Sequence, residues 1–439
     1  DWKACGKPDG KAGLLERLAA IDSIYIPVFY HVTYNDDDTV SSVTPSHPSA
    51  PPKIIRRIIE KLPPPVVKPV VPYLEAVQDR GVIEISRGCV RGCRFCHAGV
   101  VYRPSRQRPH KEVLEAADAI IRNCGYDEIS LLSLSTSDYD GIEALVTEFG
   151  ERYKGRHIAV SLPSLRVTSG SVALVESLPD KRRSGLTFAP EAASQRLGRV
   201  INKVIPEEEI LATASAAFER GWTTLKLYYM LGLPTETLDD LTAMADMLHR
   251  VHSLGRIAPG RRPTLRVSLA TFIPKAHTPF QWTAQDDEET ITVKQRYLLD
   301  RVKNKGIRLS WSDAKMSLLE AALSRGDRRL AHVIFGAWRR GSTLDGWAEF
   351  FSWERWAEAF TEAGLDPAFY ARRVRPLEEV FPWSHIECGV SHSYLQREYR
   401  RSLAGEPTGD CHDSSCLACG LNNLVVECEE ALERRGKTE

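Results

Sequence analysis

The sequence has no long apolar run, no excess of charge and no leader-like start. Apolar residues make up 43% of the 439 residues, yet no stretch reaches the about eighteen uninterrupted apolar residues of a membrane span. Lys plus Arg and Asp plus Glu both number 58, so no overall field draws the chain to nucleic acid or to an anionic membrane. We therefore expect a soluble protein without membrane contact, in which any nucleic-acid contact is confined to a local patch.

The start of the chain and its cysteines favour the cytoplasm. The first residue is Asp1 and no charged-then-apolar leader follows, so we expect the natural N-terminus to lie upstream. The ten cysteines include three at 89–96 and three at 411–419, a clustering typical of metal sites rather than of a disulfide framework. Free thiols persist in a reducing compartment, and we predict a cytoplasmic protein.

Three thiols lie close together in RGCVRGCRFCHAG, residues 87–99. The C-x3-C-x2-C spacing of Cys89, Cys93 and Cys96 lets one loop bring three thiolates to an iron-sulfur cube and leaves one iron without a protein ligand. An electron carrier would close its cluster with a fourth nearby Cys, so the open iron indicates catalysis. Zinc with His97 as a fourth ligand is the alternative, although this is not a usual zinc spacing.

Strand and helix patterns alternate after residue 80. Apolar, β-branched runs predict six strands, and helical periodicity between them predicts four helices. This alternation predicts an α/β fold with a parallel sheet curled into a partial barrel, whose functional groups lie at the carboxyl ends of the strands. The strands are expected at 81–86, 127–135, 157–165, 185–190, 223–234 and 265–274, and the helices at 111–125, 140–153, 206–220 and 237–254.

The cysteine motif, with Phe95 before the last Cys, resembles that of the radical S-adenosylmethionine (SAM) superfamily. SLSTSDY, APEAASQRL, LGLPTET and FIPKAHTPFQW follow in the required order over residues 81–285. Together with YRPSRQR, SRGDRRL and PWSHIECGVS, they resemble a radical SAM family that carries an upstream cobalamin-binding-like domain, from about residue 20 to 420. The resemblance does not settle what that family modifies.

The resemblance implies a fold, cofactors and a partner. The fold is a partial (β/α)6 TIM-like barrel of the radical SAM type, with an N-terminal extension and a helical C-terminal region. A 4Fe-4S cluster on the three cysteines would bind SAM at its open iron, and an electron from a donor such as flavodoxin or ferredoxin would release a 5'-deoxyadenosyl radical. The chain has no D-x-H-x-x-G cobalamin signature, so cobalamin is only an inference about sequence outside it.

Polar residues at the strand exits are the candidate SAM ligands. Hydroxyls after the second strand would bond the amino or carboxylate group, a carboxylate after the fourth strand would accept the ribose hydroxyls, and later turns would meet the adenine. Plain turns, helix caps and a surface arginine are the alternatives. The candidates are Ser135, Thr136, Ser137, Ser164, Arg166, Glu191, Arg196, Gly232, Pro234 and His277. Lys275, His277, Gln281 and Trp282 could instead line a substrate cavity.

A second cysteine set lies in CHDSSCLACGLN, residues 411–422. Cys411, Cys416 and Cys419 form C-x4-C-x2-C, and the resembling family has a further Cys where this chain has Asn422. The fourth ligand is open between His412, Cys428, Cys388 and an exogenous group. An auxiliary iron-sulfur cluster and zinc both fit three thiolates.

The remaining segments predict four regions. Residues 1–80 are expected to be the tail of an upstream domain plus a Pro-rich linker, 81–285 the barrel, 286–400 a helical Trp/Arg-rich cover and 401–439 a Cys-rich tail. Arg325, Asp327, Arg328 and Arg329 could form a basic corner at the barrel mouth that contacts RNA. The alternative is that tryptophans at helical spacing form a core and that Arg-Asp pairs lock turns.

These observations predict a radical SAM enzyme that reductively cleaves SAM to modify an unknown substrate. One alternative is a SAM-dependent methyl- or methylthio-transferase acting on RNA or protein. Another, from a different class, is a non-catalytic metal-containing module that binds RNA or a ribosomal partner.

Overall fold

Two parallel sheets form the centre of the computed structural model, which describes residues 3–7, 9–74, 76–178, 185–255, 263–411, 416–426 and 428. One sheet has the order β4-β7-β8 and the other the order β12-β11-β10-β9. Every neighbouring pair in both sheets is parallel. The strands are β4 (Gly81–Glu84), β7 (Glu128–Leu132), β8 (Ala159–Ser161), β9 (Leu186–Glu191), β10 (Thr224–Leu231), β11 (Thr264–Thr271) and β12 (Ile307–Trp311).

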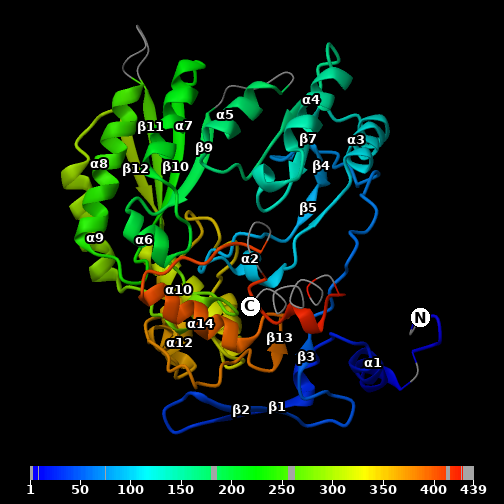
Figure 1. The fold of residues 1–439 in the computed structure, drawn as a ribbon. Helices are drawn as coiled ribbons and strands as arrows, with labels where there is room; N and C mark the ends of the chain where they lie inside the picture. The colour runs from blue at the N-terminus through cyan, green and yellow to red at the C-terminus, as the bar shows by residue number, and fades with distance from the viewer. Residues whose placement is uncertain are drawn as a thin grey trace.

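All six expected strands are present, and the α/β fold with parallel strands is confirmed. β12 is an additional strand, because the sequence beyond residue 285 was expected to be helical. Within the described part of the chain, no ladder joins β8 to β9, so the two sheets stand as separate walls of an open barrel. Figure 1 shows the two walls splayed apart, with α7 to α9 outside one and α3 and α4 outside the other.

The four expected helices are also present, and further helices lie between the described strands. α3 begins after Pro109 and ends at Gly125, whose φ of 73° is a left-handed C-terminal cap. α8 begins with a capping box formed by Thr237 and Asp240. The helices are α3 (His110–Cys124), α4 (Ile142–Arg152), α5 (Ser169–Glu176), α6 (Gln195–Val200), α7 (Glu207–Glu219), α8 (Leu238–Leu254) and α9 (Glu288–Arg301).

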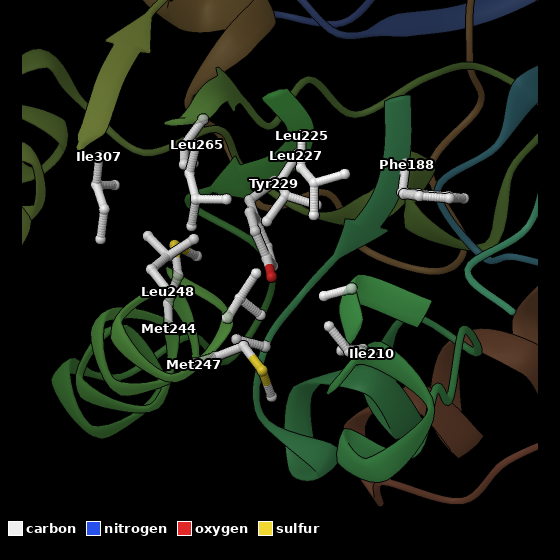
Figure 2. Packing of buried hydrophobic residues seen from close by; sticks show 14 of the residues in the cluster. Phe188, Ile210, Leu225, Leu227, Tyr229, Met244, Met247, Leu248, Leu265 and Ile307 are labelled. Carbon is white, nitrogen blue, oxygen red and sulfur yellow. The ribbon is translucent and has the colours of Figure 1, made fainter. Parts of the chain in front are cut away.

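The larger core lies between the β9–β12 sheet and its helices. Leu225, Leu227 and Tyr229 alternate along β10 and are almost fully buried. They belong to the same cluster as Met244 and Leu248 of α8 (Figure 2). Because burial of each such side chain contributes about 1.5–3 kcal/mol, this packing holds the carboxyl ends of the strands in place.

The C-terminal region lies across the end of the sheets that carries the cysteines (Figure 1). It contains α10 (Ala314–Arg325), α11 (Leu330–Arg339), α12 (Trp353–Glu362), α13 (Pro367–Ala371), β13 (Ile386–Glu387) and α14 (His392–Leu403). Trp356 is in its core, whereas Trp338 and Trp347 are 60% and 63% exposed. The expectation of a tryptophan core is therefore met at Trp356 and not at the other two positions.

The N-terminal segment contacts this C-terminal region. It contains α1 (Gly10–Ala19) and a hairpin of β1 (Tyr30–Tyr34) and β2 (Val40–Pro45), and β3 (Ile54–Ile55) pairs with β13. Arg328 donates to the carbonyl of Tyr30 at 2.9 Å, and Arg329 pairs with Asp38 at 2.7 Å. These arginines fasten the hairpin, as expected if they have a structural role. The division into four regions stays a prediction.

Arg325 is fully buried and donates to the carbonyl of Ala371 at 2.8 Å, so its guanidinium also serves the packing of the cover. Among the described helices, no segment is both long and apolar enough to cross a membrane.

Candidate metal centre and cofactor site

The cysteine loop lies between the end of β4 and the short helix α2 (His97–Val101). Its base is a small antiparallel pair, β5 (Ser86–Arg87) with β6 (Arg106–Gln107). Gly88 has a φ of 91°, and a Cβ there would lie 2.4 Å from the carbonyl oxygen of Pro104, so this turn requires glycine. The loop is therefore held in shape at the carboxyl end of a strand, where the sequence placed it.

The three thiols of this loop lie in partly or fully desolvated surroundings. Burial raises the pKa of Cys93 to about 12, with Lys203 opposing the shift, and the thiols of Cys89 and Cys96 act on Cys93 electrostatically. Burial also raises the pKa of Cys89. Gly99 N–H donates to Sγ of Cys96 at 3.3 Å. Such thiols ionise readily only with a metal or a cation beside them.

The three thiols offer soft donors from a single loop. Among the described residues, no group of three or more His, Cys, Asp or Glu side chains is gathered around one point. Zinc needs its ligands around one point, whereas each thiolate of a four-iron cluster binds a different iron. The cluster and the zinc alternative at Cys89, Cys93 and Cys96 both stay predictions.

The arginines inside the motif are paired with carboxylates. Arg87 bonds Glu84 at 2.7 Å, and Arg94 bonds Glu398 at 3.1 Å. Arg91 bonds Asp410 at 2.8 Å and also pairs with Asp138. The cations that act on the thiols are instead Lys203, which acts on Cys93, and Arg103, which acts on Cys89.

Sequence reasoning missed Lys203 and Arg103. Both lie within segments quoted for the resemblance or directly after one, but outside the cysteine motif itself. In the sequence, the only sign of a role for Lys203 and Arg103 is that each is a basic residue in or near one of these motifs.

The hydroxyl loop after β7 is brought to the cysteine loop. Ser135 donates to Asp138 at 2.7 Å, and Arg166 lies 3.5 Å from the same carboxylate. Ser137 accepts from the backbone N–H of Arg166 at 3.1 Å. Asp138 in turn acts electrostatically on Cys89. Ser135, Ser137 and Arg166 thus form one network beside the first cysteine.

Thr136 and Ser164 have different surroundings. Thr136 is fully buried, and its hydroxyl bonds that of Ser133 at 2.9 Å. The side chain of Ser164 is exposed, its φ is 63°, and its carbonyl accepts from the N–H of Thr136 at 3.2 Å. Both tie the two loops together, and their roles toward SAM stay predictions.

Glu191, the expected ribose ligand, lies beside Cys93. It ends β9, and its carboxylate is 3.3 Å from Nζ of Lys203. Burial raises the pKa of Glu191, and Lys203 opposes the shift. Glu191 also acts electrostatically on Cys93. A carboxylate next to the Cys93 thiol is well placed to bind a ligand that also reaches a metal group on that thiol.

Arg196 and the turn 231–237 are engaged with the protein itself. Arg196 bonds Asp240 and the carbonyl of Thr235. The N–H of Gly232 donates to Glu236 at 2.8 Å, and Lys294 neutralises Glu236 at 2.8 Å. Gly232 has a φ of 81°, and Pro234 follows it in the turn. The roles of Arg196 beside the ribose and of Gly232 and Pro234 beside the adenine stay predictions.

His277 lies where β11 leads into the cover. Burial, followed by the charges of His97 and His385, lowers its pKa to about 4, so the ring is neutral at pH 7. Its backbone N–H donates to Gln281 at 3.0 Å. Gln281 is buried and also accepts from Trp383 at 3.0 Å, while Trp282 is fully buried. Gln281 and Trp282 therefore support the wall rather than line a substrate cavity.

A cavity of about 1060 Å³ opens at the carboxyl ends of β10, β11 and β12. It reaches Phe95, which stands between Cys93 and Cys96, so it adjoins the cysteine loop. Lys275 lines it, as expected, and pairs with Glu320 at 2.6 Å. Its other lining includes Met230, Ile273, Trp311 and Met316.

The segment that leads into the second cysteine set contacts the first cysteine loop. Asp410 is bonded to Arg91, and Asn202 donates to the carbonyls of Gly92 and Thr408 at 3.1 and 3.0 Å. Cys419 packs in the same cluster as the buried Cys388 and acts on it electrostatically. His412 lies outside the described residues, and a metal at Cys411, Cys416 and Cys419 stays a prediction.

Comparison with known families agrees with this site. Residues 83–248, which hold the cysteine loop, Ser135, Glu191 and Gly232, match the family model described as the radical SAM superfamily. This match identifies a radical SAM domain within the chain over these residues.

Among curated proteins, the chain is 31% identical over 253 residues to the Uncharacterized protein MJ0966 of Methanocaldococcus jannaschii. The aligned part is 58% of this chain and 53% of the relative, so the match spans about half of that protein's length.

Solved structures of radical SAM enzymes are also similar. The radical S-adenosylmethionine methyltransferase TsrM from Kitasatospora setae, with cobalamin and a [4Fe-4S] cluster bound, matches with a TM-score of 0.39 and 11% identity over 65% of this chain and 60% of that one. Coproporphyrinogen III oxidase (HemN) from Escherichia coli matches with a TM-score of 0.32 and 17% identity over 59% and 58%. These TM-scores are low, so the assignment rests on the family model.

Proposed function

We propose that this protein reductively cleaves SAM at a 4Fe-4S cluster held by Cys89, Cys93 and Cys96, and uses the product to modify a further substrate. The observation that carries the proposal is the position of one three-cysteine loop at the carboxyl end of β4, inside the radical SAM match. When bound, the cluster supplies the electron that splits SAM into methionine and a 5'-deoxyadenosyl radical.

The residues around the loop would bind and orient SAM. Glu191 accepts the two ribose hydroxyls, because a carboxylate can accept both. Ser135, Ser137 and Arg166 hold the amino and carboxylate groups, since their network lies beside Cys89. Thr136, Ser164, Arg196, Gly232, Pro234 and His277 are supporting or adenine-side residues in this proposal.

The cavity next to Phe95 would hold the substrate. Its walls combine apolar side chains with the Lys275–Glu320 pair, so it suits a partly apolar molecule or side chain that also carries a polar group. A substrate filling about 1060 Å³ excludes water from a reactive radical.

Further partners belong to the same proposal. A one-electron donor such as flavodoxin or ferredoxin reduces the cluster in the cytoplasm. Cys411, Cys416 and Cys419, with Cys388 nearby, hold a second iron-sulfur cluster or zinc. RNA and protein are the substrate classes to test, and cobalamin would have to bind outside the motifs of this chain.

The experiment compares Cys93→Ala with Cys124→Ala after anaerobic reconstitution with iron and sulfide. Cys124 ends α3 and belongs to neither cysteine set, so its loss is the matched control. We expect Cys93→Ala to lose the cluster's absorption and to form at least about a hundredfold less 5'-deoxyadenosine, while Cys124→Ala retains both. Normal cleavage by Cys93→Ala would overturn the proposal.

The product distinguishes the reaction classes. Incubation of the reduced protein with SAM and with cellular tRNA, rRNA or protein fractions should form 5'-deoxyadenosine. S-adenosylhomocysteine as the main product would instead identify methyl or methylthio transfer. Zinc alone in the purified protein, with neither product, would identify a binding module.

A further inference from the structure

Arg103 is a buried cation that no carboxylate neutralises within the described part of the chain. The residue is 4% exposed. Nε donates to the carbonyl of Gly99 at 3.1 Å, and Nη1 donates to the hydroxyl of Tyr394 at 3.2 Å. Among the described residues, no Asp or Glu forms an ion pair with it, unlike Arg94 in the same segment. These neutral partners accept hydrogen bonds from Nε and Nη1 but do not balance the charge.

A charge in this position needs an anion close by. Burying a cation without a counter-charge costs several kcal/mol, and a guanidinium cannot lose its proton to escape that cost. The anions available to Arg103 are cysteine thiolates rather than carboxylates. Metal-bound thiolates are the form in which buried cysteines carry charge.

Arg103 stands between the two cysteine sets. A Cβ added at Gly92, between Cys89 and Cys93, would lie 3.2 Å from Nη2 of Arg103. Burial alone would lower the pKa of Arg103, but Tyr394, Cys419 and Cys411 outweigh it and raise the pKa. The same guanidinium acts electrostatically on Cys89. Arg103 thus lies beside the first loop at Gly92 and Gly99, and it bonds Tyr394, which packs in the same cluster as Cys419.

We propose that Arg103 is the shared counter-cation of two metal–thiolate groups, one on Cys89, Cys93 and Cys96 and one on the tail thiols Cys411 and Cys419, and that its charge sets how easily the first group is reduced. This inference rests on the proposed function, because it needs a cluster on the first set. It assigns the tail a role beside the first site.

The sign of the effect follows from electrostatics. An added electron is stabilised by a nearby positive charge and destabilised by a nearby negative one. Removing the charge of Arg103 should therefore lower the reduction potential of the first cluster. Removing the anionic tail group should raise it.

The test is a redox titration of the reconstituted full chain, followed by electron paramagnetic resonance without SAM. We expect Arg103→Met to lower the ratio of reduced to oxidised cluster at least about tenfold at a fixed potential, which is roughly 59 mV for one electron. Arg103→Lys keeps the charge and should stay within about threefold. Cys419→Ser should shift the ratio in the opposite direction.

Arg106→Met is the matched control, because Arg106 donates to the carbonyls of Pro104 and Tyr102 and has no electrostatic interaction with a cysteine. An unchanged potential in Arg103→Met, or one equal to that of Arg106→Met, overturns the inference. If Arg103→Met does not fold, the reduction potential of the first cluster in Cys419→Ser tests the inference instead. A potential equal to that of the wild type would overturn the inference too. A wild-type protein without any cluster refutes the proposed function instead.

Discussion

Two arginines beside the cysteine loop bury positive charge in different ways. Arg94 is fully buried and bonds Glu398 together with the carbonyls of Arg199, Val200 and Glu406. Arg103 is almost as buried, but its partners among the described residues are the phenol of Tyr394 and the carbonyl of Gly99. The charge of Arg94 is balanced by the polypeptide itself. The charge of Arg103 would be balanced by an anionic metal–thiolate group on the cysteines.

The difference suggests a structural role for Arg94 and a role at the metal site for Arg103. A buried ion pair with all its partners holds two elements together, and breaking it is costly. A buried cation facing desolvated thiols instead prepares a place for a metal–thiolate group. Two experiments test this contrast, and a third tests a paired carboxylate away from the loop.

Removal of the cluster should have the largest effect on stability. The cluster-free protein leaves Arg103 and the buried Cys93 without compensation, so we expect its free energy of unfolding to fall by more than about 4 kcal/mol, the linkage expected for a ligand at a thousand times its dissociation constant. Guanidinium unfolding of the reconstituted and chelated proteins measures the difference. In Cys93→Ala, chelation should cost less than in the wild type, because only the tail group is left to remove. An equal loss there would contradict the account.

Glu398→Gln should have the next largest effect. The substitution keeps the shape but leaves Arg94 without its carboxylate, at a cost of about 3 kcal/mol. The control is Glu387→Gln, which removes an exposed partner of Lys53 and should cost less than about 1 kcal/mol. Unfolding of both variants in the cluster-free state separates this pair from the metal site. Equal stabilities would show that Arg94 does not depend on its partner.

Asp240→Asn should have the smallest effect. Burial alone would raise the pKa of Asp240, but hydrogen bonds from Arg196, Ser194 and Thr237 outweigh it and lower the pKa. Its stabilisation is therefore present above the unfolded-state value of about 4 and is lost as pH falls through the lower folded-state value. We expect a cost of about 1–2 kcal/mol at pH 7.

The pH dependence provides the check for Asp240. The difference in unfolding free energy between wild type and Asp240→Asn should narrow as pH falls below about 4. Asp239→Asn is the control, because Asp239 is exposed on the same helical turn. A difference that does not change with pH would contradict the assigned role.

Local patterns predicted most of the barrel. Apolar runs such as those of β10 and β11 fill a buried sheet face, and their length and flanking turns suffice to place them. β12 was missed because only Ile307 of its five residues is buried, so no apolar run marks it. The separation of the two sheets depends on which strand edges pair, and local sequence does not encode that.

The site was predictable where one motif holds its own residues. Cys89, Cys93 and Cys96 share a single loop, and their spacing alone predicts a metal centre there. Arg103 and Lys203 could not be assigned, because their role depends on how α2 and the segment after α6 fold back on that loop. The exposure of Trp338 likewise depends on which face of α11 packs against α12, which periodicity leaves open.

The most direct test of the central claim is the electron paramagnetic resonance spectrum of the reduced, reconstituted protein with and without SAM. Three thiolates leave one iron without a protein ligand, so SAM should bind there and change the signal. The account predicts a shifted spectrum in the wild type at saturating SAM. An identical spectrum in both conditions would show that the fourth iron is closed to SAM, and would contradict the account.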